Sequence, residues 1–300
     1  MKTYQKEIAL EYRDFPTLYQ ESDSLAVRSQ RKYYLLVRVK ILFLIVTSIM
    51  TSIIWSQEFR TPISVAFALM LVLSMSLGAV LNMRNFDRLW LNGRAIAEAI
   101  KAETWRFMMN VDPYNKSSTD PESEERFLNR LGEILRQRPT VSAHLCLNLQ
   151  EGVQITEHMK KMRKESLNNR RTYYVQNRIH DQRRWYAQKA NWNKNKEARW
   201  FALAWVLELV AVMTAIVVIV SQNTLINPVG MVATFGAGVL SWMNARSYSE
   251  PAEAYGFVAE QLALCEDKAK QISSEETLEK NVRDVEGAIS QEQTIWIARL

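Results

Sequence analysis

The sequence predicts an all-α membrane protein, with four transmembrane helices arranged as two hairpins and long cytoplasmic helices that form a bundle. Four apolar stretches predict the spans, at about residues 41–56, 63–82, 200–221 and 225–245. Only short segments, 56–62 and 222–224, separate the partners of each pair. A helix of about 20 residues crosses a 30 Å hydrocarbon layer. Because backbone groups in lipid must be satisfied internally, these stretches should be helices.

The distribution of Lys and Arg predicts the orientation of the spans. The mean hydropathy of −0.20 and the net charge of +6 reflect polar residues that lie almost entirely outside the four stretches. Basic residues flank the outer ends of both pairs, whereas the two hairpin loops together carry one base, Arg60. By the positive-inside rule, both termini and the middle region are expected in the cytoplasm. A receptor for an external ligand is therefore not expected.

The chain is predicted to be a duplicated two-span unit. When the two halves of the chain are aligned so that Ile63 matches Leu225, Asn82 also matches Asn244. The hydropathy profiles of the two halves then agree, although the sequence identity between them is low. Both copies enter and leave on the cytoplasmic side, which is typical of a same-orientation repeat. We therefore expect a first unit at 1–112, a linker with a short helix at 113–150 and a second unit at 151–300.

Outside the spans the pattern is helical. Residues 122–138 place apolar side chains on one face, and Pro139 should end that helix. Residues 84–109 should prolong the second span. Because Gly and Pro are absent from 153–227, that stretch predicts a rod on the order of 110 Å, interrupted near 167–169 or 191–195, where Asn is frequent. A C-terminal apolar stripe should be packed: Leu278, Val282, Val285 and Ile289.

Charge is sorted between the cytoplasmic helices. Residues 153–199 are rich in bases, and the tail after Glu250 is rich in acids. A basic helix packed beside an acidic one, within one subunit or between subunits, explains this pattern. Two alternatives stay open. The bases could contact anionic lipid headgroups, or they could bind nucleic acid or a nucleotide messenger, with Trp185 and Tyr186 stacking on a base.

The candidate pore or gating residues lie inside the spans. Glu208 stands out because a carboxylate within the membrane usually faces a bundle interior or a water-filled path, although a protonated Glu bonded to a neighbouring helix is an equal alternative. Hydroxylated residues could wet a pore or bond back to their own helix. The candidates are Thr47, Thr51, Thr214 and Thr234. Small residues that permit close helix packing are Gly78, Gly230 and Gly238.

Signals of an enzyme are missing from the sequence. The three histidines lie in no metal-ligand pattern, and no P-loop occurs. We therefore expect no catalytic residues, no cofactor and no metal, and we do not expect nucleic acid as a partner.

One segment resembles a known family. Residues 178–190, RIHDQRRWYAQKA, resemble the R-I-x-D-Q-x-x-W-Y-x-x-K-A signature of SLATT proteins. Upstream, Phe15-Pro16, Tyr19 and Gln30, and later Trp105-Arg106-Phe107 and Pro113-Tyr114, resemble a sister subfamily, so that the likeness covers nearly the whole chain as two tandem units.

The resemblance implies a channel in the bacterial cytoplasmic membrane that acts as an effector of a conflict or antiviral defence system and stays closed until a signal arrives. We expect a homo-oligomeric pore formed between subunits, because two hairpins leave little room for an aqueous path within one chain. Because the usual sensor domains of the family are not recognised in this sequence, the trigger is expected to come from a separate sensor protein or from the cytoplasmic helices themselves, with a nucleotide messenger as a candidate partner. The candidate sensor or partner surface is Arg178, Asp181, Gln182, Trp185 and Tyr186. The alternative is a non-conducting membrane scaffold that recruits a cytoplasmic partner.

Overall fold

The computed structural model of the chain is built from helices. It describes residues 12–53, 56–115, 119–145, 152–221 and 228–297. The elements are η1 (Tyr12–Asp14), α2 (Thr17–Ser52), α3 (Gln57–Arg84), α4 (Phe86–Met108), α5 (Asp120–Arg136), α6 (Pro139–Leu145), α7 (Glu157–Arg163), α8 (Leu167–Tyr174), the π-helical turn η2 (Val175–His180), α9 (Asp181–Ser221), α10 (Pro228–Arg246), α11 (Ser249–Ala269) and α12 (Glu275–Ile297).

The chain divides into two compact units, each built from separate stretches of sequence. We call residues 1–29, 87–190 and 253–300 the bundle unit, and residues 30–86 and 191–252 the span unit. Helices α2 and α9 each contribute residues to both units.

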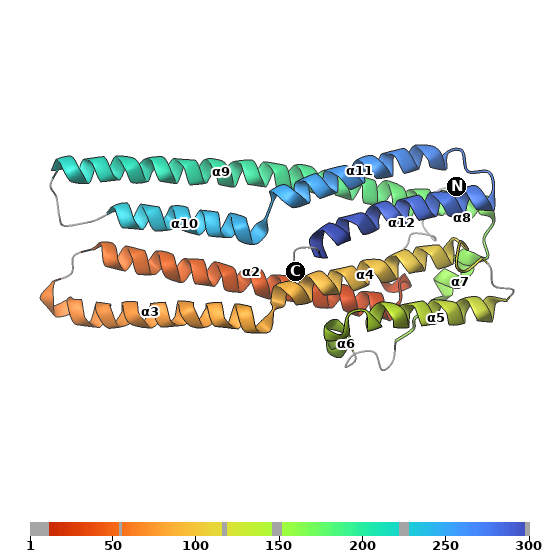
Figure 1. Cartoon of the computed structure of the whole chain (residues 1–300), viewed down its shortest axis with the longest axis horizontal. Helices are drawn as coiled ribbons and strands as arrows, with labels where there is room; N and C mark the ends of the chain where they lie inside the picture. The colour runs from red at the N-terminus through yellow and green to blue at the C-terminus, as the bar shows by residue number, and fades with distance from the viewer. Residues whose placement is uncertain (1–11, 54–55, 116–118, 146–151, 222–227, 298–300) are drawn as a thin grey trace. The chain divides into compact units, whose positions relative to one another are not determined.

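The span unit pairs α2 with α3 and α9 with α10 (Figure 1). Thr47 on α2 donates to the sulfur of Met70 on α3, and Gly236 on α10 is buried near Leu207 on α9. Helix α2 also contacts α10, where the Ser48 hydroxyl donates to the carbonyl of Gly230 at 3.2 Å. Side chains from four separate stretches of sequence therefore meet in this unit.

Three helical stretches in the described residues are long and apolar enough to cross a membrane: Thr17–Ser52, Gln57–Met108 and Leu167–Ser221. They contain the second and third expected spans, and residues 41–52 of the first. The fourth expected span corresponds to α10, which is not among these three, so its membrane crossing stays a prediction. Residues 54–55, within the first expected span, and 222–227, which hold the second loop and the start of the fourth span, lie outside the described residues.

Side-chain caps define the starts of three helices in the bundle unit. Thr119, Thr156 and Ser166 each accept a hydrogen bond from the backbone N–H three residues later, at the starts of α5, α7 and α8. Asn85 adopts a left-handed conformation (φ 44°) and separates α3 from α4. Residues 84–109 are therefore helical, as predicted, but with a break at Asn85.

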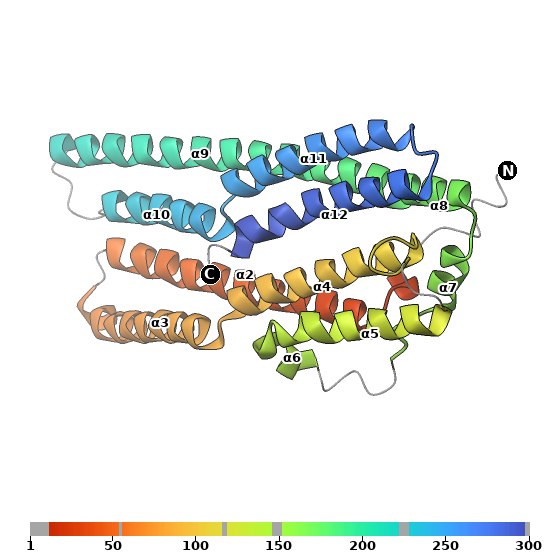
Figure 2. The same ribbon diagram turned by 45° about the vertical axis from the view of Figure 1, so that its right-hand side comes forward.

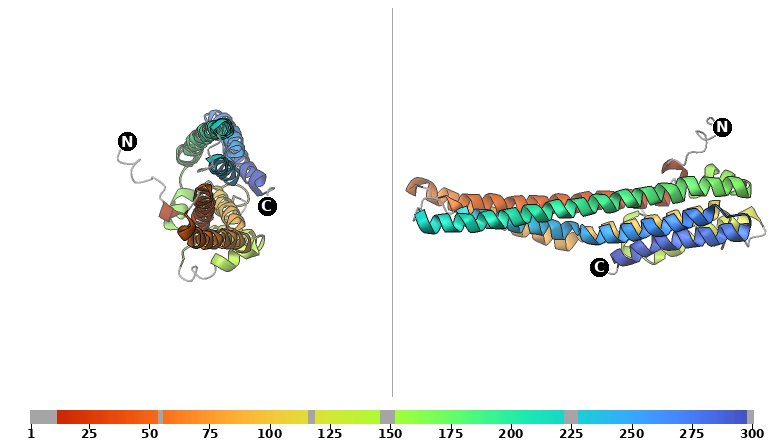
Figure 3. Two further views of the ribbon diagram at one scale, coloured as in Figure 1. Left: turned by 90° about the vertical axis from the view of Figure 1, so that its left-hand side faces the viewer. Right: turned by 90° about the horizontal axis from the view of Figure 1, so that it is seen from above.

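A single apolar core fills the bundle unit. Helices α11 and α12 run alongside each other (Figure 2, Figure 3), joined by the Asn281 side chain, which donates to the carbonyl of Cys265. The predicted stripe on α12 is fully packed, with Leu278, Val282 and Val285 at 0% exposure. The predicted apolar face of α5 is also confirmed, because Phe127 and Leu131 are buried.

The long basic stretch is interrupted once. Helix α7 ends at Arg163 and α8 begins at Leu167, so the break at 164–166 immediately precedes one of the two predicted places. The alternative break at Asn191–Asn195 is wrong, because α9 passes through it without interruption. Helix α5 ends at Arg136, before Pro139 as predicted, and Pro139 begins α6.

Candidate functional site

Glu208 lies on an exposed face of α9. Its neighbours on the helix are exposed apolar side chains, including Trp205 at 61% and Leu209 at 64%. Glu208 is eight residues past Trp200, which is about 12 Å along the helix axis. The carboxylate therefore stands on an outward, otherwise apolar surface of the single chain, and the interpretation as a Glu bonded to a neighbouring helix of the same chain does not fit.

The candidate hydroxyls of the spans are mostly bonded to their own helices. Thr51 donates to the carbonyls of Thr47 and Ser48, Thr214 to that of Ala211, and Thr234 to that of Gly230. Thr47 is buried and donates to the sulfur of Met70. Within a single chain these groups need no water to satisfy them, which favours the second of the two interpretations left open by the sequence.

The three candidate packing glycines differ in their surroundings. A Cβ added at Gly238 would lie 3.1 Å from Ile41 Cγ2, so this glycine permits close contact between α10 and α2. At Gly78 the nearest atom would be Lys40 Nζ at 3.6 Å, and at Gly230 nothing would lie within 4 Å. Gly238 alone of the three is required by a close approach.

Aromatic and basic side chains join α2 to α10 near the ends of the predicted spans. The guanidinium of Arg246 lies 4.1 Å from the ring centroid of Tyr34, and that of Arg38 lies 4.9 Å from Trp242. The rings of Tyr34 and Trp242 meet edge to face at 5.8 Å. Aromatic rings with Arg partners are typical of a membrane interface, and the sequence analysis did not single this cluster out.

The signature residue Arg178 is completely buried in the bundle unit. Its Nη2 lies 2.6 Å from Glu286 Oε2 and its Nε donates to Glu286 Oε1 at 3.0 Å, while the Tyr174 hydroxyl donates to the same carboxylate. Burial alone lowers the pKa of the Arg178 guanidinium, but the charge of Glu286 raises that pKa above its usual value. Glu98 lies 4.0 Å from Arg178 Nη1.

The rest of the signature is only partly exposed. Tyr186 is 1% exposed and packs against Tyr255 with 5.6 Å between ring centroids, while Trp185 is half-buried and meets the same ring at a tilt, with 5.5 Å between centroids. Asp181 is exposed and Gln182 is half-buried. The expectation of a sensor or partner surface is therefore wrong for Arg178 and Tyr186, because a guanidinium and a phenol that anchor the core are not accessible to a partner. Asp181 and Gln182 remain accessible.

The sorted charges pair within one chain. Arg183 Nη1 lies 2.7 Å from Glu266 Oε2, and His180 Nδ1 lies 3.2 Å from the other oxygen of the same carboxylate. Arg170 pairs with Glu275. Burial raises the pKa of Glu266, but its bonds to Arg183 and His180 outweigh this and lower it below its usual value. The basic stretch thus packs beside the acidic tail, as the first interpretation predicted.

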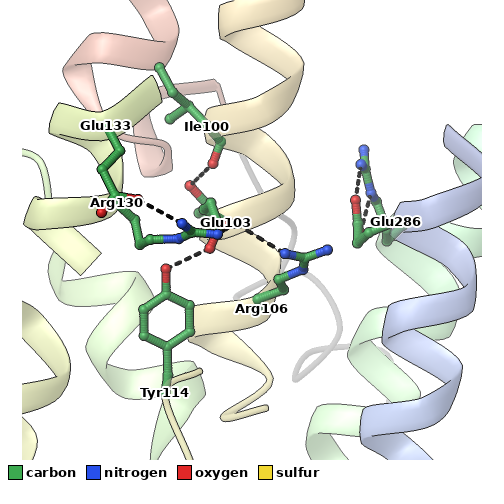
Figure 4. A network of polar contacts seen from close by, with 9 residues as sticks. Ile100, Glu103, Arg106, Tyr114, Arg130, Glu133 and Glu286 are labelled. Atoms are coloured by element: carbon green, nitrogen blue, oxygen red, sulfur yellow. Dashed lines mark hydrogen bonds and ion pairs between the residues drawn. The ribbon is translucent and has the colours of Figure 1, made fainter. Parts of the chain in front are cut away.

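A second buried polar network joins α4 and α5 and was missed by sequence reasoning. Glu103 accepts a 2.6 Å hydrogen bond from the Tyr114 hydroxyl and pairs with Arg106 at 3.1 Å, while Arg130 lies 4.0 Å away and pairs with Glu133 (Figure 4). Burial, reinforced by Glu103, raises the pKa of the Tyr114 phenol. The sequence pattern that could have indicated a polar network here is the pair of Arg126 and Arg130, which lie four residues apart on one face of α5.

This network borders a cavity of about 400 Å³, lined by residues of α4, α5, α12 and the segment after α4. Among the described residues, no group of three or more His, Cys, Asp and Glu side chains has the arrangement of a metal site.

Two family matches cover most of the chain. Residues 16–171 match the SMODS and SLOG-associating 2TM effector domain 3, and residues 174–296 match the SMODS and SLOG-associating 2TM effector domain 1. No curated protein and no solved structure matches the chain significantly. Such domains are associated with bacterial defence or conflict systems as effectors. The first match alone covers more than half of the sequence, and the chain therefore belongs to the SLATT family, as a protein with two SLATT domains in tandem.

Proposed function

We propose that this protein is a pore-forming membrane effector of a bacterial conflict or antiviral defence system. Several copies assemble in the cytoplasmic membrane, with four spans per chain and both termini in the cytoplasm. A cytoplasmic signal opens the pore and ion gradients are dissipated. The family supports the role of an effector, and three long apolar helices support membrane association.

The exposed carboxylate of Glu208 carries the proposal. A charged side chain at the centre of a transmembrane helix costs about 3 kcal/mol on insertion scales and usually faces a bundle interior or a water-filled cavity. Glu208 faces outward from the single chain, among exposed Trp205 and Leu209. A neighbouring copy that covers this face, with water reaching the carboxylate, removes that cost.

The pore is formed between chains in this proposal. Within one chain, Thr51, Thr214 and Thr234 bond to their own helices, so they offer little lining for an internal path. Helices α2 and α9 contribute residues to both units, so a rearrangement in the bundle unit is transmitted along continuous helices into the spans.

The second candidate function is a non-conducting scaffold. Asp181 and Gln182, which remain accessible on the signature segment, favour recruitment of a separate protein partner by the bundle unit. In this case Glu208 serves only contacts between subunits, and ion flux is not expected.

A cell-based assay of membrane potential separates the two. Expression of the intact protein under activating conditions should depolarise the membrane, and Glu208→Gln should change the rate or extent of depolarisation because it removes the charge from the proposed path. Glu260→Gln is the matched control, since it removes an exposed carboxylate outside the predicted spans. Equal depolarisation by the unaltered protein and both variants would show that Glu208 has no role in ion flux. A membrane potential that stays intact with all three proteins would support the scaffold.

A further inference from the structure

The cavity beside the Glu103 network is surrounded by arginines. Its volume is about 400 Å³, within the range of small-molecule sites. Four guanidinium groups line it, together with two carboxylates: Arg106, Arg126, Arg130, Arg283, Asp112 and Glu279. Cations outnumber anions two to one in the lining itself, and two further carboxylates, Glu103 and Glu133, pair with Arg106 and Arg130 beside it.

Each arginine is oriented by a bond to a carbonyl or a carboxylate, and Arg130 also lies 4.0 Å from a second carboxylate, that of Glu103. Arg126 donates through Nη1 to the carbonyl of Pro113 at 2.6 Å, and Arg106 donates through Nη1 to Glu103. Arg130 donates to Glu133, and Arg283 donates through Nη2 to Glu279 at 2.7 Å. A guanidinium carries five N–H donors, so these bonds orient the groups without exhausting them.

We propose that this cavity binds a small, soluble anion with linked phosphate groups, in the class of inorganic pyrophosphate and tripolyphosphate. The planar fork of Arg matches two phosphate oxygens at once, and charge-assisted bonds of this kind are among the strongest hydrogen bonds in proteins. Several guanidinium groups around one cavity suit an anion with more than one phosphate, because linked phosphates spread their negative oxygens over a longer distance than a single phosphate does.

The rest of the described lining argues for a compact ligand. It consists of Val111, Pro113 and Val282, which offer no aromatic face on which a base could stack. Trp185 and Tyr186, which the sequence analysis considered for that role, are not in this lining and already pack against Tyr255. A nucleoside part of a ligand would therefore gain little here, and recognition is confined to the phosphates.

The position of the cavity gives the ligand a consequence for the fold. Arg106, Arg126 and Arg130 belong to the first SLATT segment, whereas Glu279 and Arg283 belong to the second. Figure 4 shows the Arg106 side chain extending from α4 toward α12, which carries Glu286. A bound polyphosphate therefore ties the two SLATT segments together within the bundle unit.

Calorimetry with the full chain tests this inference without any measurement of ion flux. The protein is placed in nanodiscs of neutral lipid and titrated with tripolyphosphate, and one site per chain is expected. Arg126→Gln and Arg283→Gln should each weaken binding by about tenfold or more, because each removes a charge-assisted contact. Arg283→Lys keeps the charge but loses the fork and should fall between. Arg136→Gln, at an exposed arginine of the same helix α5, is the matched control and should bind as the unaltered protein does.

Three outcomes overturn the inference. The first is no binding up to about 1 mM ligand. The second is equal weakening by all of the Gln variants, which would indicate general electrostatic attraction. The third is loss of tripolyphosphate binding when the nanodiscs contain anionic phospholipid, which would assign the cavity to a lipid headgroup. Unchanged melting temperatures of the variants ensure that a loss of binding reflects the site.

Discussion

Removal of one partner from the buried pair of Arg178 and Glu286 should strongly destabilise the bundle unit. Both side chains are 0% exposed, and two bonds of 2.6 and 3.0 Å join them. Arg178→Met leaves the buried carboxylate of Glu286 with the Tyr174 hydroxyl and with the more distant charge of Lys101, and Glu286→Leu leaves a buried guanidinium with Glu98 at 4.0 Å. An uncompensated buried charge of this kind costs about 3–5 kcal/mol.

The expected shift in melting temperature follows from this cost. For a cooperative unit of about 150–250 residues, each kcal/mol lowers the melting temperature by about 2–4 °C, so each single variant should melt about 6–20 °C lower. The loss in the free energy of unfolding of the double variant should be smaller than the sum of the two single losses by about 2 kcal/mol or more, because the double variant leaves no unpaired charge in the core.

Thermal unfolding of the detergent-solubilised protein, followed by circular dichroism, measures the three variants. Arg183→Met is the matched control: it breaks a pair with a similar distance of 2.7 Å, but Arg183 is 47% exposed. Solvent screens that pair, so its loss should cost about 1 kcal/mol or less. The reasoning is refuted if Arg178→Met and Glu286→Leu destabilise the protein no more than Arg183→Met does. It is also refuted if the loss of stability in the double variant equals the sum of the two single losses.

Three further results are expected. Burial lowers the pKa of His158 below its usual value of 6.5, so the unfolded chain binds more protons than the folded one and stability should decline as the pH falls below about 6.5. Comparison of thermal unfolding at pH 7 and pH 5 should show a smaller loss of stability for His158→Gln than for the unaltered protein. His144→Gln should lose as much stability between these pH values as the unaltered protein does. Gly93→Leu should lower stability by about 1–3 kcal/mol in a thermal melt, because even a Cβ added at this position would lie 3.4 Å from atoms of α2 and the larger side chain has no space. Thr51→Val and Thr234→Val should leave ion flux unchanged in a vesicle assay, because both hydroxyls bond to their own helices, and a clear change in flux would place them on a water path.

The elements with a strong period were predictable from the sequence. The stripe of Leu278 and Val282 and the α5 face with Phe127 depend on spacing along one helix, and both pack as expected. Charge sorting indicated the pairing of basic and acidic helices as one of several interpretations, and the contacts of Arg183 with Glu266 and of Arg170 with Glu275 show it within one chain. The break at 164–166 follows from local capping, because Ser166 bonds to the N–H of Asn169.

Other features depend on contacts between distant residues. Charge and helical spacing do not distinguish Arg178, which is completely buried against Glu286, from the exposed Arg183 five residues later, although only Arg178 is a fixed residue of the signature. The Glu103 network requires Tyr114 and Arg130 to come together across a turn, a juxtaposition that follows from the packing of α4 against α5. Helical spacing placed Gly230 and Gly238 on one face, but the partner helix decides that only Gly238 lies in close contact.

Recording from a planar lipid bilayer tests the central claim most directly. Purified full-length protein, added under activating conditions, should produce discrete steps of current, because a pore assembled between subunits opens and closes as a unit. Glu208→Gln should change the size or ion selectivity of those steps, whereas Glu260→Gln should not. A bilayer that holds verified, correctly assembled protein and still passes no current would contradict the account.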